Sequence, residues 1–141
     1  MSGTVHTIGY GGRNPDEFLA LLNGHAVTLV VDVRLRPDKA SMGSYVKAKD
    51  PSKGIEGLLA KKGIRYVSLI ELGNPFVGLP DWESRYRRLL DAARDVLLER
   101  LRALAPPYCL LCAEKRVAEC HRLTIADFLV RTRGWAVEHI E

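Results

Sequence analysis

The chain has 141 residues, 47% of them hydrophobic and 27% charged, with a net charge of +4. This composition is typical of one globular domain, and it excludes a membrane-spanning segment because no apolar run approaches the roughly 18 residues required. The first residues lack a basic stretch followed by an apolar one, so we expect a cytoplasmic protein without a secretion signal. We interpret residues 1–141 as a single α/β domain.

The cysteine count and the polar composition narrow the class of protein further. Three cysteines, an odd number, argue against a secreted disulfide framework. Glutamine is absent and asparagine occurs only at positions 14, 23 and 74, a thermophile-like composition in which an intracellular disulfide is less unusual. The positive charges are interspersed with acids, so the sequence gives nucleic-acid binding little support.

The first half of the chain alternates strand and helix patterns. Val5–Ile8 predicts a short strand that ends at Gly9–Gly12, and Asn14-Pro15 supplies a cap for a helix over residues 15–23. Val27–Val31 is apolar throughout and rich in β-branched residues, which is typical of a buried parallel strand. This strand leads directly into Asp32-Val-Arg34, the first candidate site residues.

The middle of the chain begins with an irregular segment. Residues 36–54 have no clear period and contain two prolines, so we expect a loop with functional potential. A short helix is expected over 54–62, stopped by Gly63, and it is followed by the strand Ile64–Leu69. Glu71 lies in the loop after this strand.

The second half contains the strongest helical pattern. From Asp81 to Leu104, apolar residues recur at spacings of three and four, and Pro106-Pro107 ends the pattern. Next come an apolar strand, Tyr108–Cys112, a helix over 121–133 and a final strand, Trp135–Ile140.

The order of these elements, β-α-β-α-β-α-β-α-β, predicts the fold class. We expect a single-domain, three-layer α/β/α architecture with a mainly parallel, Rossmann-like sheet of about five strands. Because parallel strands share a carboxyl edge, Asp32, Arg34, Glu71 and Cys112 should converge there. The sequence therefore predicts a composite site at this edge.

Two thiols carry the candidate chemistry of that site. Cys112 and Cys120 flank the connection to the last helix, and His121-Arg122 follow at once, so either thiol could become a nucleophilic thiolate. Burial of Cys112 as a small apolar residue is the alternative. Cys109 should point to the opposite sheet face and pack in the core.

Metal binding is a separate question for the cysteines. Cys109 and Cys112 with Cys120-His121 superficially supply four zinc ligands, but residues 109 and 112 diverge within a strand, so we expect no metal. A looser site using Cys112, Cys120 and His121 stays open, as does a Cys112–Cys120 disulfide.

Anion binding is the other expectation. The free N–H groups at the start of the last helix favour an anion, and glycines in the first strand-to-helix turn would let backbone approach a ligand. The candidate ligand-binding residues are Gly9, Tyr10, Gly11, Arg34 and Arg122. The candidate catalytic residues are Cys112, Cys120, His121, Asp32 and Glu71. An Asp32–Arg34 ion pair and a loop-capping role for Glu71 are the structural alternatives.

Several motifs along the chain resemble a known family. They are Thr7-Ile-Gly-Tyr10, Val31-Asp-Val-Arg34, Ile64-Arg-Tyr-Val67, Glu71-Leu-Gly73, Leu111-Cys-Ala-Glu-Lys115 and Cys120-His-Arg122. Together they look like the family catalogued as domain of unknown function 488. The resemblance implies a site that includes Asp32, Arg34, Glu71, Cys112, Cys120, His121 and Arg122, but it supplies no substrate.

A weaker similarity is to rhodanese-like sulfurtransferases, which also place Asp-Val-Arg after a strand and a catalytic cysteine after a later one. Here the loop after Cys112 is longer and carries Glu114 and Glu119, so persulfide chemistry is an analogy only. We expect an enzyme that acts on a small anionic or nucleotide-like ligand through a Cys/His/Arg site. The alternatives are a thiol redox or metal-binding module and a nucleic-acid-associated binding protein. The sequence identifies no cofactor and no oligomeric state.

Overall fold

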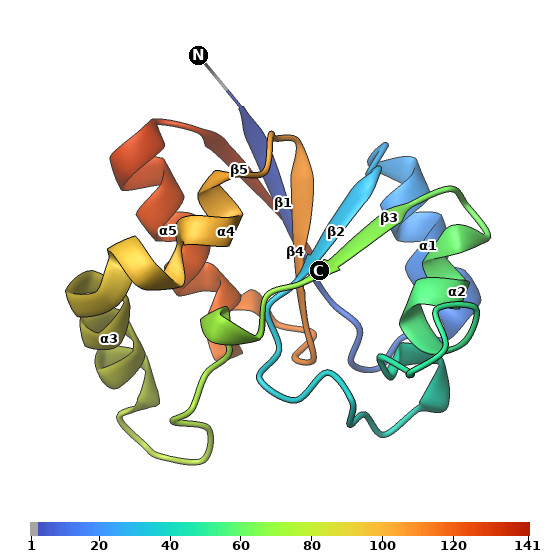
Figure 1. Ribbon diagram of the computed structural model, residues 1–141, viewed down its shortest axis with the longest axis horizontal. Coiled ribbons are helices and arrows are strands. Elements are labelled where there is room, and N and C mark those ends of the chain that lie inside the picture. The colour runs from blue at the N-terminus through green and yellow to red at the C-terminus, as the bar shows by residue number, and fades with distance from the viewer. Residues whose placement is uncertain (1–2) are drawn as a thin grey trace.

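The computed structural model describes residues 3–141, so the first two residues of the chain lie outside the described part. Its centre is an all-parallel sheet with the strand order β3-β2-β4-β1-β5 (Figure 1). The strands are β1 (Thr4–Gly9), β2 (Leu29–Asp32), β3 (Arg65–Ser68), β4 (Tyr108–Cys112) and β5 (Ala136–Ile140). The predicted sheet is confirmed in both strand number and direction.

Helices cover both faces of the sheet, which confirms the expected α/β/α layers (Figure 1). One face carries α1 (Pro15–Gly24) and α2 (Gly54–Ala60), and the other carries α3 (Trp82–Leu97), α4 (Glu99–Arg102) and α5 (Arg122–Arg133). Three short 3-10 helices lie in the connections: η1 (Gly43–Tyr45), η2 (Ile70–Leu72) and η3 (Val117–Glu119).

Local chemistry sets the ends of the regular helices. The Asn14 side chain accepts a hydrogen bond from the backbone N–H of Glu17 at 2.8 Å, and Pro15 occupies the first turn of α1. At the other end of the chain, α5 stops at Gly134, whose φ of 67° is the left-handed conformation that glycine adopts readily.

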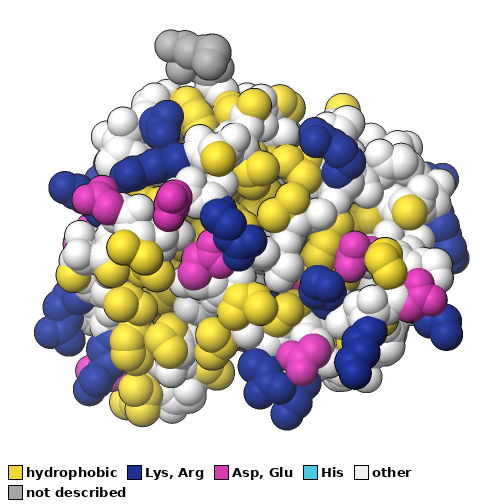
Figure 2. All heavy atoms as spheres, in the orientation of Figure 1, with side chains coloured by type: hydrophobic (Ala, Val, Ile, Leu, Met, Phe, Trp, Pro, Cys, Tyr) yellow, Lys and Arg dark blue, Asp and Glu magenta, His cyan; other side chains and the backbone are white. Residues whose placement is uncertain are grey.

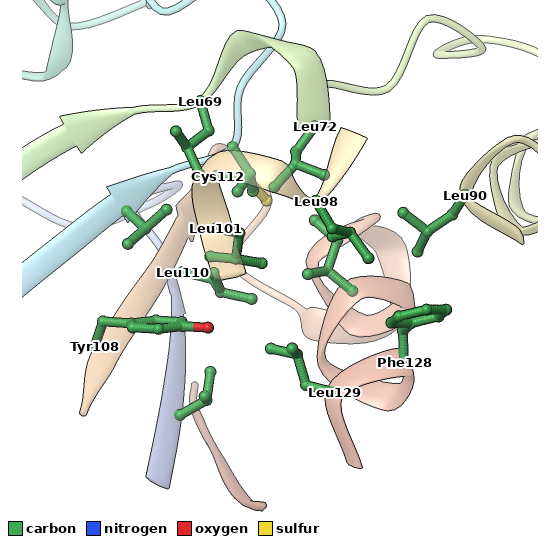
Figure 3. Packing of buried hydrophobic residues seen from close by; sticks show 14 of the residues in the cluster. Leu69, Leu72, Leu90, Leu98, Leu101, Tyr108, Leu110, Cys112, Phe128 and Leu129 are labelled. Carbon is green, nitrogen blue, oxygen red and sulfur yellow. The ribbon is translucent and has the colours of Figure 1, made fainter. Parts of the chain in front are cut away.

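Strand β4 lies at the middle of the sheet and is buried along its whole length. Tyr108, Leu110 and Cys112 pack toward α3, α4 and α5 in the cluster shown in Figure 3. Cys109 and Leu111 pack on the opposite face, against α1 and α2. The expectation that Cys109 and Cys112 point to opposite faces is therefore confirmed, and it follows from the two-residue repeat of a strand.

The long helix expected over residues 81–104 is divided in the structure. Helix α3 is kinked at Ala93, where φ is −117° and ψ is 21°, and it ends at Leu97. Leu98 also leaves helical geometry, with φ −97° and ψ 3°, before α4 begins. Leu98 is only 1% exposed whereas Val96 is 73% exposed. Three consecutive apolar residues, 96–98, fit more than one helical face, so the break that places Leu98 in the core was not visible in the periodicity.

Charge is scattered over the surface. On the face seen in Figure 2, Lys and Arg side chains lie among Asp and Glu side chains and apolar groups without forming a continuous stripe. Among residues 3–141, no helix combines the length and apolar character that crossing a membrane requires.

The packing predicts a large stability cost for truncating the centre of the sheet. Leu110 is fully buried on β4, so Leu110→Ala should lower the free energy of unfolding by about 2–5 kcal/mol because it leaves a cavity. Urea denaturation followed by circular dichroism measures the change. Val96→Ala, at an exposed helical position, is the control and should change it by less than about 0.5 kcal/mol. Equal effects would contradict the described packing.

Candidate functional site

A sulfur and imidazole cluster lies at the carboxyl edge of the sheet. Cys112 ends β4, Cys120 follows η3, and His121 precedes the first turn of α5. One donor atom from each of these residues lies within 4.8 Å of the other two, and all three residues are buried. The structure pairs Cys112 and Cys120 as a disulfide, the alternative that the sequence left open, with Cα atoms 7.3 Å apart.

The orientation of His121 follows from one hydrogen bond. Its Nε2 lies 2.6 Å from the backbone carbonyl oxygen of Val33. Because a carbonyl only accepts, Nε2 carries the proton, and Nδ1 presents a lone pair 3.7 Å from Cys120 Sγ. Burial lowers the pKa of His121 to about 4, so the imidazole is neutral at neutral pH. Its Nδ1 is therefore available as a base or as a ligand.

Arg122 lies behind the cluster and is 0% exposed. Its Nη1 donates to Cys112 Sγ at 3.2 Å and to the Glu114 carbonyl at 2.7 Å, while Nη2 donates to the Lys115 carbonyl at 3.1 Å. Burial lowers its pKa to about 10, which leaves it a cation at neutral pH. Arg122 therefore places a cation beside the Cys112 sulfur, and the Glu114 carboxylate lies 3.7 Å from the same sulfur.

Asp32 and Arg34 form a second buried unit at the same edge. Arg34 Nη2 donates to Asp32 at 2.7 Å and Nη1 donates to the Tyr45 carbonyl at 2.7 Å. The Tyr66 hydroxyl also donates to Asp32. Burial by itself lowers the pKa of Arg34, but the hydrogen bonds and charge of Asp32 outweigh it and the pKa is raised. The structure therefore shows the Asp32–Arg34 ion pair that the sequence offered as a structural alternative.

The Arg34 guanidinium also packs beside a pair of stacked aromatic rings, Tyr10 and Tyr45. It lies 5.2 Å from the centre of the Tyr10 ring, which stacks on Tyr45 at a centroid distance of 4.5 Å. Tyr45 in turn donates its hydroxyl hydrogen to the Arg13 carbonyl at 2.7 Å. Segment 36–54 is thereby anchored by Tyr45, which is buried in the core.

These two units border a cavity of about 440 Å³. Its lining includes the three residues of the sulfur and imidazole cluster together with Glu114 and Glu119. It also includes Tyr10, Arg34, Arg36, Lys39, Asn74 and Trp82. The cavity therefore combines thiols and acidic groups with cationic and aromatic ones.

The remaining candidates lie away from this cavity. Glu71 accepts hydrogen bonds from Arg100, the shorter at 2.6 Å, and this contact lowers the pKa of its carboxyl. Asp32 is fully buried behind Arg34. The first-turn glycines make room for the loop after β4: a Cβ at Gly9 would collide with the Glu114 carbonyl, and the Gly11 N–H donates to the Ala113 carbonyl at 2.8 Å.

Some lining residues were missed at the level of sequence. Arg36 and Lys39 fall in segment 36–54, for which only a general functional potential was expected. Trp82 falls within the apolar pattern over residues 81–104, which indicates a helix rather than a site, and no motif marks Asn74. No local sequence pattern marks these residues as part of a site, because the segments that carry them come together only in the folded structure.

Fold and site together define an open, parallel α/β protein with a Cys–His cluster at the carboxyl edge of its sheet. A family model described as Domain of unknown function DUF488 matches residues 14–129, most of the chain, so the chain belongs to this family. Comparison with curated proteins and with solved structures finds no significant match.

The buried Asp32–Arg34 pair generates a stability prediction. Asp32→Asn removes the charge that faces a buried guanidinium, so it should lower the free energy of unfolding by about 3–5 kcal/mol. Asp38→Asn is a matched control, because Asp38 pairs with Arg36 across the same two-residue spacing at the surface. Thermal unfolding should show a large loss for the first variant and none for the second; similar losses would contradict a special role for the buried pair.

Proposed function

We propose that this protein is an enzyme that acts on a small anionic or nucleotide-like ligand, with Cys112, Cys120 and His121 as its reactive centre. The observation that carries the proposal is that these three buried groups line a 440 Å³ cavity whose lining also includes Arg34, Arg36 and Lys39. A volume of this order suits a small organic ligand.

The cationic and aromatic lining residues indicate the kind of ligand that the cavity would bind. Arg36 and Lys39 would attract an anionic group such as a phosphate or carboxylate. Tyr10 and Trp82 offer apolar surface to a ring or chain. Because Cys112, Cys120 and His121 line the same cavity, a ligand held by these groups would lie near the reactive centre.

The electrostatics of the reactive centre support a chemical role. His121 presents the lone pair of Nδ1 beside Cys120, and the Arg122 cation lies beside the Cys112 sulfur. Each group is held by contacts on its far side, with the Val33 carbonyl for His121 and the loop carbonyls for Arg122. Such prior positioning is typical of catalytic groups, which react best from a fixed geometry.

Anion binding by Arg36 and Lys39 is tested with a panel of inorganic phosphate, sulfate and nucleoside mono- and diphosphates. At least one should raise the melting temperature of the wild type in differential scanning fluorimetry. Arg36→Ala and Lys39→Ala should each raise the Kd of that ligand about 10-fold, because each removes one charged contact. Lys61→Ala, an exposed lysine that does not line the cavity, is the control and should bind normally. The anion part of the proposal fails when no compound binds, or when all three variants bind as the wild type does.

Turnover is tested on the compounds that bind. Cys120→Ser and His121→Asn should lower kcat by about 100-fold or more while the Kd changes little. The reason is that these substitutions alter the reactive centre and leave Arg36 and Lys39 in place. Product formation followed by mass spectrometry measures the rate, and circular dichroism checks the fold. Unchanged turnover in both folded variants would contradict a catalytic role for the cluster.

A further inference from the structure

The spacing of Cys112 and Cys120 bears on what joins them. Their Cα atoms are 7.3 Å apart. Disulfides usually span about 4.4–6.8 Å between Cα atoms, whereas two thiolates bound to one zinc ion at about 2.3 Å each lie about 3.8 Å from one another. The wider backbone spacing therefore favours two sulfurs that share an ion over two that share a bond.

Each of the three donor atoms also has an outer contact that orients it. The Arg122 guanidinium donates to Cys112 Sγ at 3.2 Å, and the Arg122 backbone N–H donates to Cys120 Sγ at 3.5 Å. The third donor, His121 Nδ1, is set by the bond of Nε2 to the Val33 carbonyl. Outer hydrogen bonds of this kind fix the direction and the protonation state of metal ligands.

Charge balance agrees with a bound cation. Zinc binds cysteine as the thiolate and histidine as the neutral imidazole, so two cysteines and one histidine together balance the charge of one divalent ion. The buried cluster would then carry no net charge apart from that of Arg122.

We propose that Cys112, Cys120 and His121 bind one Zn²⁺ ion, with a fourth coordination position open to the cavity. Two sulfurs and one imidazole nitrogen are ligands that zinc prefers, and three protein ligands with one open position are typical of catalytic zinc sites. All three residues line the cavity, and so does Glu114. The open position would accept water or an oxygen of the ligand, and the Glu114 carboxylate lies 3.7 Å from one of the ligand sulfurs, Cys112 Sγ.

The expectation of no metal from the sequence concerned a four-ligand site that included Cys109. That argument holds for Cys109, which lies on the opposite face of the sheet. The inferred site uses only the three residues that remain. It goes beyond the proposed function because it names a resident ion, and it does not depend on the identity of the ligand.

The test is metal binding by the whole protein. Protein purified in reductant without chelator should contain about one zinc per chain by elemental mass spectrometry. The metal-free, reduced protein should bind about one equivalent of Co²⁺ and show thiolate-to-cobalt charge-transfer absorption together with the visible bands of a tetrahedral site.

Variants assign the ligands. Cys120→Ser and, as a second and independent case, Cys112→Ser should weaken Co²⁺ binding about 100-fold or more and reduce the charge-transfer absorption. Cys109→Ser removes a cysteine from the same strand without removing a ligand, so it should keep the wild-type spectrum. Circular dichroism identifies the variants that fold.

Three results would overturn the inference: no cobalt spectrum in the reduced wild type, equal losses in Cys109→Ser and the ligand variants, or a Cys112–Cys120 disulfide that forms in the presence of zinc. Failure of the proposed function is a separate outcome. Metal bound with no anion binding would refute the anionic ligand alone, and anion binding without metal would refute the ion alone.

Discussion

The buried guanidinium of Arg122 is the interaction on which the site depends. It begins α5, yet its hydrogen bonds reach back to the end of β4 and to two carbonyls of the loop that follows. One cation therefore fixes the strand, the loop and the helix relative to each other. A charge buried at 0% exposure is costly unless it finds hydrogen-bond partners, and the loop carbonyls supply them for both Nη groups, while Nε has no partner. Cys112 and Cys120, at the two ends of that loop, are brought together as a result.

The position of the segment that carries Arg36 and Lys39 depends on a second buried charge. Asp32 holds Arg34, and Arg34 reaches the Tyr45 carbonyl in the segment between β2 and α2. This contact and the burial of the Tyr45 ring explain how an irregular segment keeps a defined position over the edge of the sheet. Arg36 and Lys39 lie in that segment, so their place in the cavity lining depends on the Asp32–Arg34 pair.

The parallel sheet explains why both units occur at one edge. Strand β4 is buried on both faces, which leaves no surface along its length for polar chemistry. Its pairing sets Gly9 opposite Cys112 and Asp32 opposite Leu111, so three strands end at nearly the same level. Polar side chains that follow these strands meet there, and the absence of a side chain at Gly9 lets the loop after β4 cross the end of β1.

Strand periodicity and parallel connections are local rules, so the parallel α/β fold, the opposite faces of Cys109 and Cys112, and the grouping of Asp32, Arg34 and Cys112 at one edge could be predicted from the sequence. The same rules predicted that Cys120-His121-Arg122 would lie beside Cys112.

Which of these groups face the cavity depends on contacts between distant segments. Arg122 and Asp32 point inward to buried partners, and Glu71 binds Arg100 instead. The helical pattern over residues 81–104 is broken at Ala93 and at Leu98, and Leu98 is buried in the core. Arg36, Lys39 and Trp82 join the site through segments whose positions no local pattern encodes.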